Sequence, residues 1–306
     1  MSGYVIRRLL ALIPTLIGVL FAAFLMLHLI PGDPARVAAG PDASDEDIAL
    51  IRERYGLDKP LWEQFALYLG RVVQGDLGES FRSRRPVVQE IARRLPATVE
   101  LAAGGMLLAV LLGVPLGVAA SLRPNTLLDN LITGASVLGI SMPSFFLGLI
   151  LMIVFSAQLG LLPPTGRGGI EHLVLPSVTL GLAYVATFAR LTRSNMLDVL
   201  SEDYIRTARA KGLRRRRVIW WHALVNAAIP LLTLLGVYFG RLLGGAVIIE
   251  SVFAWPGLGR YMVDGIVTRD FDVVQASILV FATAIVLVNL AVDLLYGIVD
   301  PRLSRG

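Results

Sequence analysis

The chain has 306 residues, of which 55% are hydrophobic and 17% are charged, and its mean hydropathy is +0.69. Soluble globular proteins carry about 25% charged residues, so this composition excludes an ordinary soluble enzyme and a disordered protein. The chain has no cysteine and only three histidines, which excludes disulfides, thiolate metal sites and a histidine-rich metal centre. The net charge of +5 fits the basic cytoplasmic loops of a membrane protein better than nucleic-acid binding.

Six apolar stretches are long enough to cross a bilayer, which takes about 20 residues in a helix. They cover residues 9–30, 101–122, 131–159, 173–189, 227–249 and 273–292. Arg7 and Arg8 precede the first stretch as in a signal peptide, but its 22 residues exceed the usual apolar region of about 7–15, so we expect an uncleaved span. The third stretch is expected to tilt or bend near Pro143. Together they predict an all-α polytopic membrane protein with six transmembrane helices.

The distribution of lysine and arginine predicts the orientation of these helices. With the N-terminus inside, the inner segments hold 14 of these residues and the outer segments hold 13. These totals do not distinguish the two possible orientations. The loop 31–100 is too long for the positive-inside rule, and without it the outer segments hold 3. Both termini are therefore expected in the cytoplasm.

Two segments between the stretches are large enough to have structure of their own. The outer loop 31–100 holds 12 acidic and 10 basic residues and is too long for a simple connection. A helix is expected over 44–55, where Asp45, Glu46 and Asp47 suit the positive end of a helix dipole. We expect two domains: the first helix with this extracytoplasmic subdomain at 1–93, and a five-helix core at 94–300 that includes the inner loop 190–226.

The inner loop 190–226 holds nine basic and three acidic residues and contains a short predicted helix. Its end signals are Ser201 as N-cap, Glu202 and Asp203 in the first turn, Arg209 and Lys211 in the last turn, and Gly212 as the stop. Tyr204, Ile205 and Ala208 are spaced to lie on one side. From these residues alone two interpretations stay open: a solvated helix whose neighbouring run 214–217 lies at anionic headgroups, or a helix that docks on a partner.

The sequence of this loop resembles the cytoplasmic coupling loop of the permease subunits of dipeptide/oligopeptide ABC importers. The resemblance covers residues 202–212 and continues through His222-Ala223-Leu224 and Asn226. Eight further motifs of that family occur in order and at similar spacing over nearly the whole chain: Arg7-Arg8, Ile30-Pro31-Gly32-Asp33-Pro34, Gly56-Leu57-Asp58-Lys59-Pro60, Gly75-Asp76-Leu77-Gly78, Pro96-Ala97-Thr98-Val99-Glu100-Leu101, Ser141-Met142-Pro143, Trp255-Pro256-Gly257-Leu258-Gly259 and Asp293-Leu294-Leu295-Tyr296-Gly297.

This resemblance implies a type I ABC importer permease fold in the cell (inner) membrane, with six helices and the N-terminus inside. It also implies a second homologous permease, two cytoplasmic ABC ATPase subunits and an extracytoplasmic peptide-binding protein as partners. ATP and Mg²⁺ would belong to the ATPase subunits, because this chain has no Walker A sequence: its only lysines, at positions 59 and 211, do not follow glycine. No enzyme activity, bound cofactor or metal is expected in the chain itself.

The resemblance assigns ATPase coupling to eight residues of the inner loop: Glu202, Asp203, Tyr204, Thr207, Ala208, Lys211, Gly212 and Leu213. The general importer pattern there is Glu-Ala-Ala, followed after three residues by Gly. Aligned on its glycine, this chain has Arg206-Thr207-Ala208 in that place. The leading acid is missing, which removes the basis for a salt bridge from it but not for a docking helix.

The fifth stretch carries two further features. Gly236, Gly240 and Gly244 recur every four residues and predict a side that another helix approaches closely, either in this chain or in a partner. Arg241 lies about 12 Å from the outer end of the stretch at 1.5 Å per residue, where a charge usually faces a wet cavity or a partner. We hypothesise that Arg241 lines the outer half of a translocation path. The alternative is that it snorkels outward or pairs with an acid of the partner permease.

The predicted function is the permease subunit of an ATP-driven importer that, with a second permease, forms the path for di- or oligopeptides delivered by a binding protein. The same transporter class with nickel or glutathione as substrate is the alternative, because selection occurs largely in the binding protein. A secondary transporter would favour paired intramembrane acids or broken helices, and the inner four stretches contain no acid. A membrane enzyme is disfavoured, because Gly139-Ile140-Ser141 has no evident base and suits a kink beside Pro143.

Overall fold

The fold comes from a computed structural model, which describes residues 2–29, 33–39, 43–54, 56–127, 129–134 and 142–299. Over these ranges the chain is helical apart from its turns, and the one pairing of extended backbone is an isolated bridge between Glu79 and Pro86. Some predictions fall outside the described residues: the turn at 30–32, residue 55 of a predicted helix, residues 135–141 of the third stretch, and the C-terminal segment 300–306.

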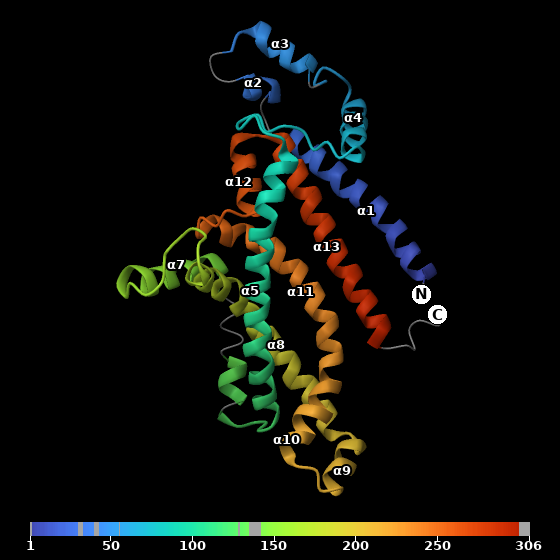
Figure 1. The fold of residues 1–306 in the computed structure, drawn as a ribbon, viewed down its shortest axis with the longest axis vertical. Helices are drawn as coiled ribbons and strands as arrows, with labels where there is room; N and C mark the ends of the chain where they lie inside the picture. Colours follow the sequence, from blue (N-terminus) through green and yellow to red (C-terminus); the bar gives the residue numbers. More distant parts are fainter. Residues whose placement is uncertain are drawn as a thin grey trace. The chain divides into compact units, whose positions relative to one another are not determined.

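All six apolar stretches contain helices (Figure 1). These are α1 (Ser2–Leu29), α5 (Val87–Ser121), α7 (Ser144–Leu151) with the π-helix η1 (Met152–Gln158), α8 (Ile170–Ser201), α11 (Leu224–Val252) and α13 (Phe271–Val299). Four candidate spans, in α5, α8, α11 and α13, are long and apolar enough to cross a membrane, with mean hydropathies of 2.2, 1.5, 1.8 and 2.3. The apolar helices Leu10–Met26 and Ser144–Gln158 are shorter. The prediction of an all-α polytopic membrane protein is confirmed.

Two of the predicted stretches have other limits in the structure. α8 runs for 32 residues rather than over 173–189, because Arg190 marks the edge of the apolar zone and arginine continues a helix well. In the third stretch, residues 135–141 before Pro143 lie outside the described residues, so the predicted tilt or bend there stays a prediction. α7 begins after Pro143, whose carbonyl accepts a hydrogen bond from the N–H of Phe146 at 3.1 Å. A proline that cannot donate its own hydrogen bond suits a helix start better than a helix interior.

Shorter helices complete the chain: α2 (Pro34–Ala39), α3 (Asp45–Arg54), α4 (Leu61–Val73), α9 (Asp203–Ala210), α10 (Arg215–Arg217), the π-helix η2 (Val218–Ala223) and α12 (Leu258–Thr268). The helix expected over 44–55 is confirmed as α3. The Asp47 N–H donates to Ser44 Oγ at 3.2 Å and the Ser44 N–H donates to the Asp47 carboxylate at 3.1 Å, which is a reciprocal cap. Hydrogen bonds from Ser44 hold the pKa of Asp47 below its usual value.

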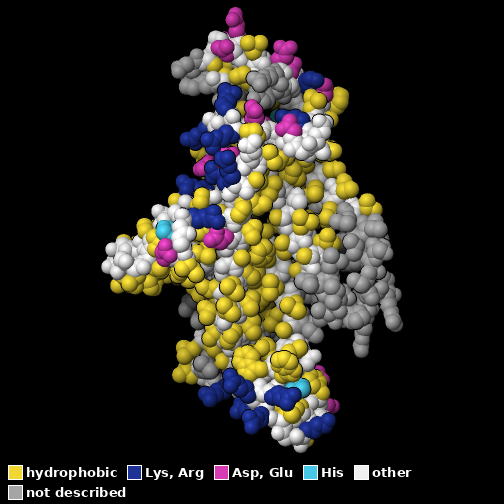
Figure 2. Space-filling model, viewed as in Figure 1, with side chains coloured by type: hydrophobic (Ala, Val, Ile, Leu, Met, Phe, Trp, Pro, Cys, Tyr) yellow, Lys and Arg dark blue, Asp and Glu magenta, His cyan; other side chains and the backbone are white. Residues whose placement is uncertain are grey.

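The helices gather into two compact units. Among the described residues, the first comprises those in 99–255 and 285–299, and the second comprises those in 2–98 and 256–284. On the visible face, apolar side chains cover the long helices of the first unit, and lysine and arginine side chains gather at its end around α9 and α10 (Figure 2). That distribution agrees with a membrane-embedded body that has a basic surface at one end.

Glycines bring α5 and α8 of the first unit close together. A Cβ added to Gly181 on α8 would lie 2.5 Å from the carbonyl oxygen of Gly105 on α5, and real Cβ atoms essentially never approach within 3.0 Å. Gly113 and Gly117 repeat this contact along α5, where an added Cβ would meet backbone carbonyls of α8 within 3.0 Å. The backbones of the two helices are therefore in direct contact, as in small-residue packing of membrane helices.

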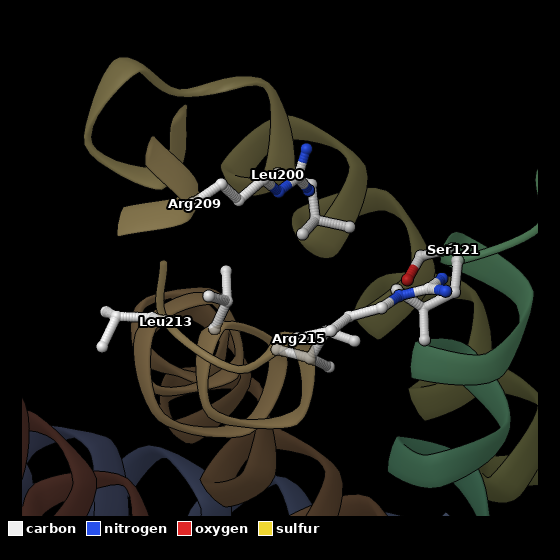
Figure 3. A pocket seen from close by; sticks show the side chains of 8 residues that line it. Ser121, Leu200, Arg209, Leu213 and Arg215 are labelled. Atoms are coloured by element: carbon white, nitrogen blue, oxygen red, sulfur yellow. The ribbon is translucent and has the colours of Figure 1, made fainter. Parts of the chain in front are cut away.

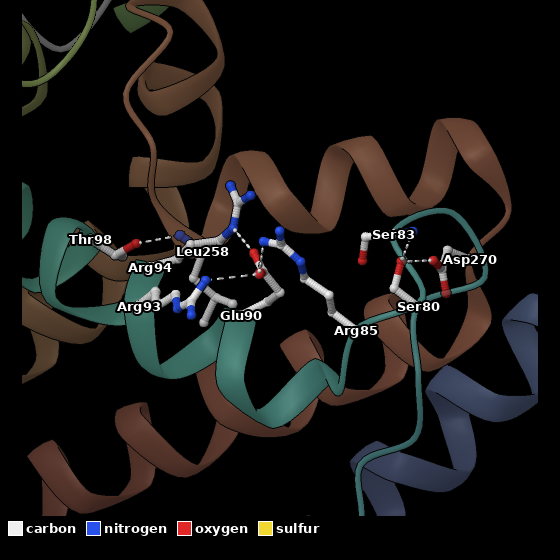
Figure 4. A network of polar contacts seen from close by, with 9 residues as sticks. All are labelled: Ser80, Ser83, Arg85, Glu90, Arg93, Arg94, Thr98, Leu258 and Asp270. Atoms are coloured by element: carbon white, nitrogen blue, oxygen red, sulfur yellow. Dashed lines mark hydrogen bonds and ion pairs between the residues drawn. The ribbon is translucent and has the colours of Figure 1, made fainter.

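Buried polar contacts hold the second unit together (Figure 4). The Oγ1 of Thr98, fully buried, accepts a hydrogen bond from the N–H of Leu258 at 2.8 Å. The Ser80 hydroxyl donates to the Asp270 carboxylate at 2.7 Å. The buried Glu90 lies among three arginines, at N···O distances of 3.3, 3.7 and 3.4 Å from Arg85, Arg93 and Arg94. These contacts satisfy groups that would be costly to bury alone.

Gly117→Ala should destabilise the first unit. The added Cβ would lie 2.6 Å from the Cβ of Thr192 and still closer to the carbonyl oxygen of Ala189, and we expect this overpacking to cost about 1–3 kcal/mol. The midpoint of thermal unfolding of the purified chain in detergent should therefore fall. Gly244→Ala is the matched control, since it also adds a Cβ to a helical glycine but meets nothing within 4 Å. An unchanged midpoint for Gly117→Ala would contradict the close packing.

Candidate functional site

The predicted helix of the inner loop exists as α9. Glu202 alone separates it from α8, with an extended backbone at φ −67° and ψ 147°. The expected N-cap is wrong, because Ser201 is the last residue of α8 and its hydroxyl donates to the carbonyl oxygen of Asp198 at 2.7 Å. A serine that bonds back into its own helix does not serve the next one, and α9 begins without a side-chain cap.

Gly212 ends α9, as the sequence predicts. Its φ of +72° lies in the left-handed region that favours glycine. The Gly212 N–H donates to Arg209 O at 3.0 Å and the Leu213 N–H donates to Ala208 O at 3.3 Å. These two bonds form a Schellman motif, which turns the chain back and places Leu213 against the apolar residues beneath α9.

The buried face of α9 packs into an apolar cluster of the first unit. Ile205 is fully buried and Ala208 nearly so. The cluster also contains Val118 of α5, Met196 of α8 and Val218 of η2. Ala227 of α11 belongs to the same cluster, so α9 packs directly against the neighbouring ends of α5, α8 and α11.

The opposite face of α9 is open. The sequence predicts Tyr204 on the same side as Ile205, but Tyr204 is 42% exposed, since consecutive residues are about 100° apart around a helix. Thr207 is exposed, and its hydroxyl donates to the carbonyl oxygen of Asp203 at 3.0 Å. Of the eight residues assigned to coupling, two pack toward the cluster (Ala208 and Leu213) and six are exposed, namely Glu202, Asp203, Tyr204, Thr207, Lys211 and Gly212.

A cavity of about 490 Å³ lies beside α9 (Figure 3). Four parts of the first unit line it: the end of α5 at Ser121, α8 at Leu200, α9 at Arg209 and α10 at Arg215. Figure 3 shows both arginine side chains reaching into the cavity, Arg215 toward Ser121 and Arg209 toward Leu200. No sequence pattern pointed to this site, because its walls come from segments far apart in the chain.

An ion pair that the sequence did not predict fastens the segment before the third stretch to α8. Both Nε and Nη2 of Arg193 donate to the buried Asp129 carboxylate, Nη2 at 2.6 Å. The N–H of Asn125 donates to the same carboxylate at 2.9 Å. The hydrogen bonds from Arg193 hold the pKa of Asp129 below its usual value. The two side chains are 64 positions apart, so a count of charges along the chain could not pair them.

Arg241 on α11 is exposed and stacks on an aromatic group. Its guanidinium carbon lies 5.5 Å from the centroid of the Tyr238 ring. Tyr238 packs edge-on against Tyr184 and Phe188 of α8, with ring centroids 5.7 and 5.9 Å apart. None of the ion pairs between described residues includes Arg241. Its place in the path, or beside an acid of a partner, stays a prediction.

The three predicted packing glycines of α11 differ in their surroundings. A Cβ at Gly236 would clash with Val292 of α13, and one at Gly240 would lie 3.4 Å from Ile285 of the same helix. A Cβ at Gly244 would meet nothing within 4 Å. The first two glycines therefore face a helix of this chain, and the third leaves a bare surface.

Comparison with known proteins identifies the class of this chain. Residues 113–305 match the family described as "Binding-protein-dependent transport system inner membrane component", and residues 1–102 match its N-terminal companion, "Binding-prot-dependent transport system membrane comp, N-term". The chain belongs to this family. It is therefore an inner-membrane permease of a binding-protein-dependent ABC importer, a class that works with ATPase subunits and a binding protein. The family is one of transport components and not of enzymes.

Relatives and a solved structure agree with this assignment. The permease is 50% identical over 303 residues to the "Glutathione transport system permease protein GsiC" of Salmonella typhimurium (strain LT2) and 49% identical to that of Escherichia coli (strain K12), with 99% of each chain covered. An inward-facing structure of the MetNI methionine ABC transporter matches with a TM-score of 0.60 at 18% identity, over 70% of this chain and 97% of that chain. The predicted type I ABC importer permease fold is confirmed.

Ile205→Ala should loosen α9 from the cluster. Replacing a fully buried isoleucine by alanine removes apolar contacts and leaves a cavity, which costs about 2–5 kcal/mol. Trypsin should then cut the purified permease faster after Arg206, Arg209 or Lys211, as followed by mass spectrometry of the fragments. Thr207→Ala is the matched control, because Thr207 is exposed on the same helix. Equal cleavage rates for the two variants would show that Ile205 does not anchor α9.

Proposed function

We propose that this permease is one of two homologous membrane subunits of a glutathione importer, supplied by an extracytoplasmic binding protein and driven by two cytoplasmic ATPase subunits that bind ATP and Mg²⁺. The observation that carries the substrate is the 50% identity, over 99% of both chains, with permeases named for glutathione transport. A di- or oligopeptide, the initial prediction from the motifs, is the second candidate. Glutathione is itself a tripeptide, so both substrates present carboxylates and amide groups to the path.

Both termini are proposed to lie in the cytoplasm, which places segment 190–226 on the ATPase side. The support is the excess of basic residues, 14 on the inner segments against 3 on the outer ones without the long loop. The loop 31–100, with 12 acidic and 10 basic residues, then faces the binding protein. In this orientation α9 and its open face are accessible to an ATPase.

In this proposal the open face of α9 is the ATPase contact. Tyr204, Thr207 and Lys211 are exposed, whereas Ile205 and Ala208 are buried in the cluster that reaches α5, α8 and η2. When ATP closes the ATPase pair, the contact displaces α9, and the cluster passes the displacement to the inner ends of the long helices. Such rigid-body movement of packed helices converts an outward-open path into an inward-open one.

Arg241 is proposed to meet a carboxylate of the substrate in the outer half of the path. Glutathione carries two carboxylates and one ammonium group at neutral pH, so it is an anion. The exposed guanidinium of Arg241 can bind a carboxylate with two parallel hydrogen bonds, and the Tyr238 ring at 5.5 Å supports its position.

Gly212→Val should separate ATP hydrolysis from uptake. Valine is strained at the φ of +72° found here, so the end of α9 must rearrange. In proteoliposomes with all subunits, the assembled complex should still hydrolyse ATP. Uptake should fall about 5- to 150-fold, the range of a coupling free energy of about 1–3 kcal/mol. Gly160→Val is the matched control, with φ +62° and nothing within 4 Å. Normal uptake by Gly212→Val, or an equal loss in the control, would contradict the coupling role.

Labelled glutathione should enter proteoliposomes that hold the complete importer and its binding protein, in a saturable and ATP-dependent way. Arg241→Leu should lower that uptake about 10- to 150-fold, because hydrogen bonds to charged groups contribute about 1.5–3 kcal/mol. Arg241→Lys keeps the charge and should retain more uptake. If di- or oligopeptides are taken up and glutathione is not, the second candidate is the substrate. A normal rate for Arg241→Leu would remove this residue from the path.

A further inference from the structure

The cavity beside α9 has basic and apolar walls. Arg209 and Arg215 line it together with Leu200, Leu213 and Val218 (Figure 3). Its volume of about 490 Å³ lies in the range of about 300–1,000 Å³ that is typical of small-molecule sites. Such walls suit a ligand that has both an anionic group and an apolar part.

The basic groups around this cavity are not neutralised by the part of the chain that the structure describes. Among the described ion pairs, the one formed within residues 202–217 joins Arg206 and Asp203 at 3.5 Å. None of them involves Arg209, Lys211 or the run 214–217. The segment therefore presents a concentration of positive charge that attracts anions.

Two exposed tryptophans next to the cavity favour a position at the surface of the membrane. Trp220 and Trp221 follow the arginine run directly and are 45% and 71% exposed, and exposed tryptophans are enriched at the membrane–water interface. No Asp, Glu, Lys or Arg occurs between Arg217 and Arg241, so the apolar zone begins where the arginines end. Figure 2 shows basic side chains directly beside the apolar surface at this end of the first unit.

We propose that this cavity, the arginine pocket, binds the headgroup of an anionic phospholipid of the cytoplasmic leaflet. Arg209 and Arg215 hold the phosphate oxygens, because a guanidinium group donates two parallel hydrogen bonds to a phosphate. The side chains of Leu200, Leu213 and Val218 cover the first part of the acyl chains. The lipid then connects α9 to the end of α5 through the pocket.

An ATPase docked on α9 leaves the arginine pocket free. With 3.6 residues per turn, Arg209 lies about 160° around the helix from Thr207. Arg209 therefore stands beside the buried Ile205 and not on the open face. The lipid and the ATPase use different sides of the same short helix.

Native mass spectrometry of the complete importer with added phosphatidylglycerol or phosphatidylcholine tests this site. Phosphatidylglycerol should be retained and phosphatidylcholine lost. The double variant Arg209→Gln/Arg215→Gln should bind phosphatidylglycerol about 30-fold more weakly, since each basic residue near an anionic surface contributes about fivefold, or about 1 kcal/mol. The control variant Arg216→Gln/Arg217→Gln removes the same amount of charge next to the pocket lining. Its affinity for phosphatidylglycerol should fall by less than about fivefold. Equal losses would overturn the pocket in favour of general attraction.

A photoactivatable phosphatidylglycerol applied to the wild-type importer keeps the test decisive if the double variant does not assemble. Crosslinks at Leu200, Leu213 or Val218 would support the pocket, and crosslinks confined to other helices would overturn it. Glycerol phosphate should not compete with the lipid; full competition would make this a site for a soluble phosphate and would overturn the lipid assignment. A photocrosslinker at Leu213 that captures an ATPase subunit in place of lipid would show a protein contact and overturn it as well.

Discussion

The close approach of α5 and α8 is the constraint on which the first unit depends. Helices in a bilayer gain little hydrophobic free energy by associating, so close packing holds them together. Gly105, Gly113 and Gly117 permit that packing because none has a side chain to separate the two backbones. The same two helices carry Val118 and Met196 into the cluster beneath α9. The contacts between α5 and α8 therefore help to set the position of α9.

The second unit relies on polar contacts where the first relies on glycine. The first N–H groups of a helix have no partner inside it, and the buried Thr98 supplies one for α12 through its bond to Leu258. Glu90 is buried among arginines, and such a carboxylate is costly to leave unpaired. α5 contributes residues to both units. One continuous helix therefore combines an apolar packing surface with a set of buried polar partners.

The sequence could predict what depends on local chemistry or on composition. The six apolar stretches, the helix at 44–55 and the glycine stop at Gly212 belong to this class. It misplaced the end of α8, because charge marks the edge of a membrane and not the end of a helix, and it gave Ser201 to the wrong helix. The sequence could not predict the pair of Asp129 with Arg193 or the arginine pocket, because both join segments that are distant in the chain. Family resemblance supplied the predicted coupling residues, but only the structure separates the buried ones from the exposed ones.

The connections on the two sides of α9 differ in length, and this difference ties α9 more closely to α8 than to α10. One residue, Glu202, stands between α8 and α9, whereas residues 211–214 stand between α9 and α10. Glu202 is already extended, at φ −67° and ψ 147°, and a residue spans at most about 3.3–3.6 Å, so α9 cannot move away from α8 without pulling it. The other connection has four residues and turns back at Gly212, so it can lengthen. A displacement of α9 away from α8 therefore strains the short connection before the long one.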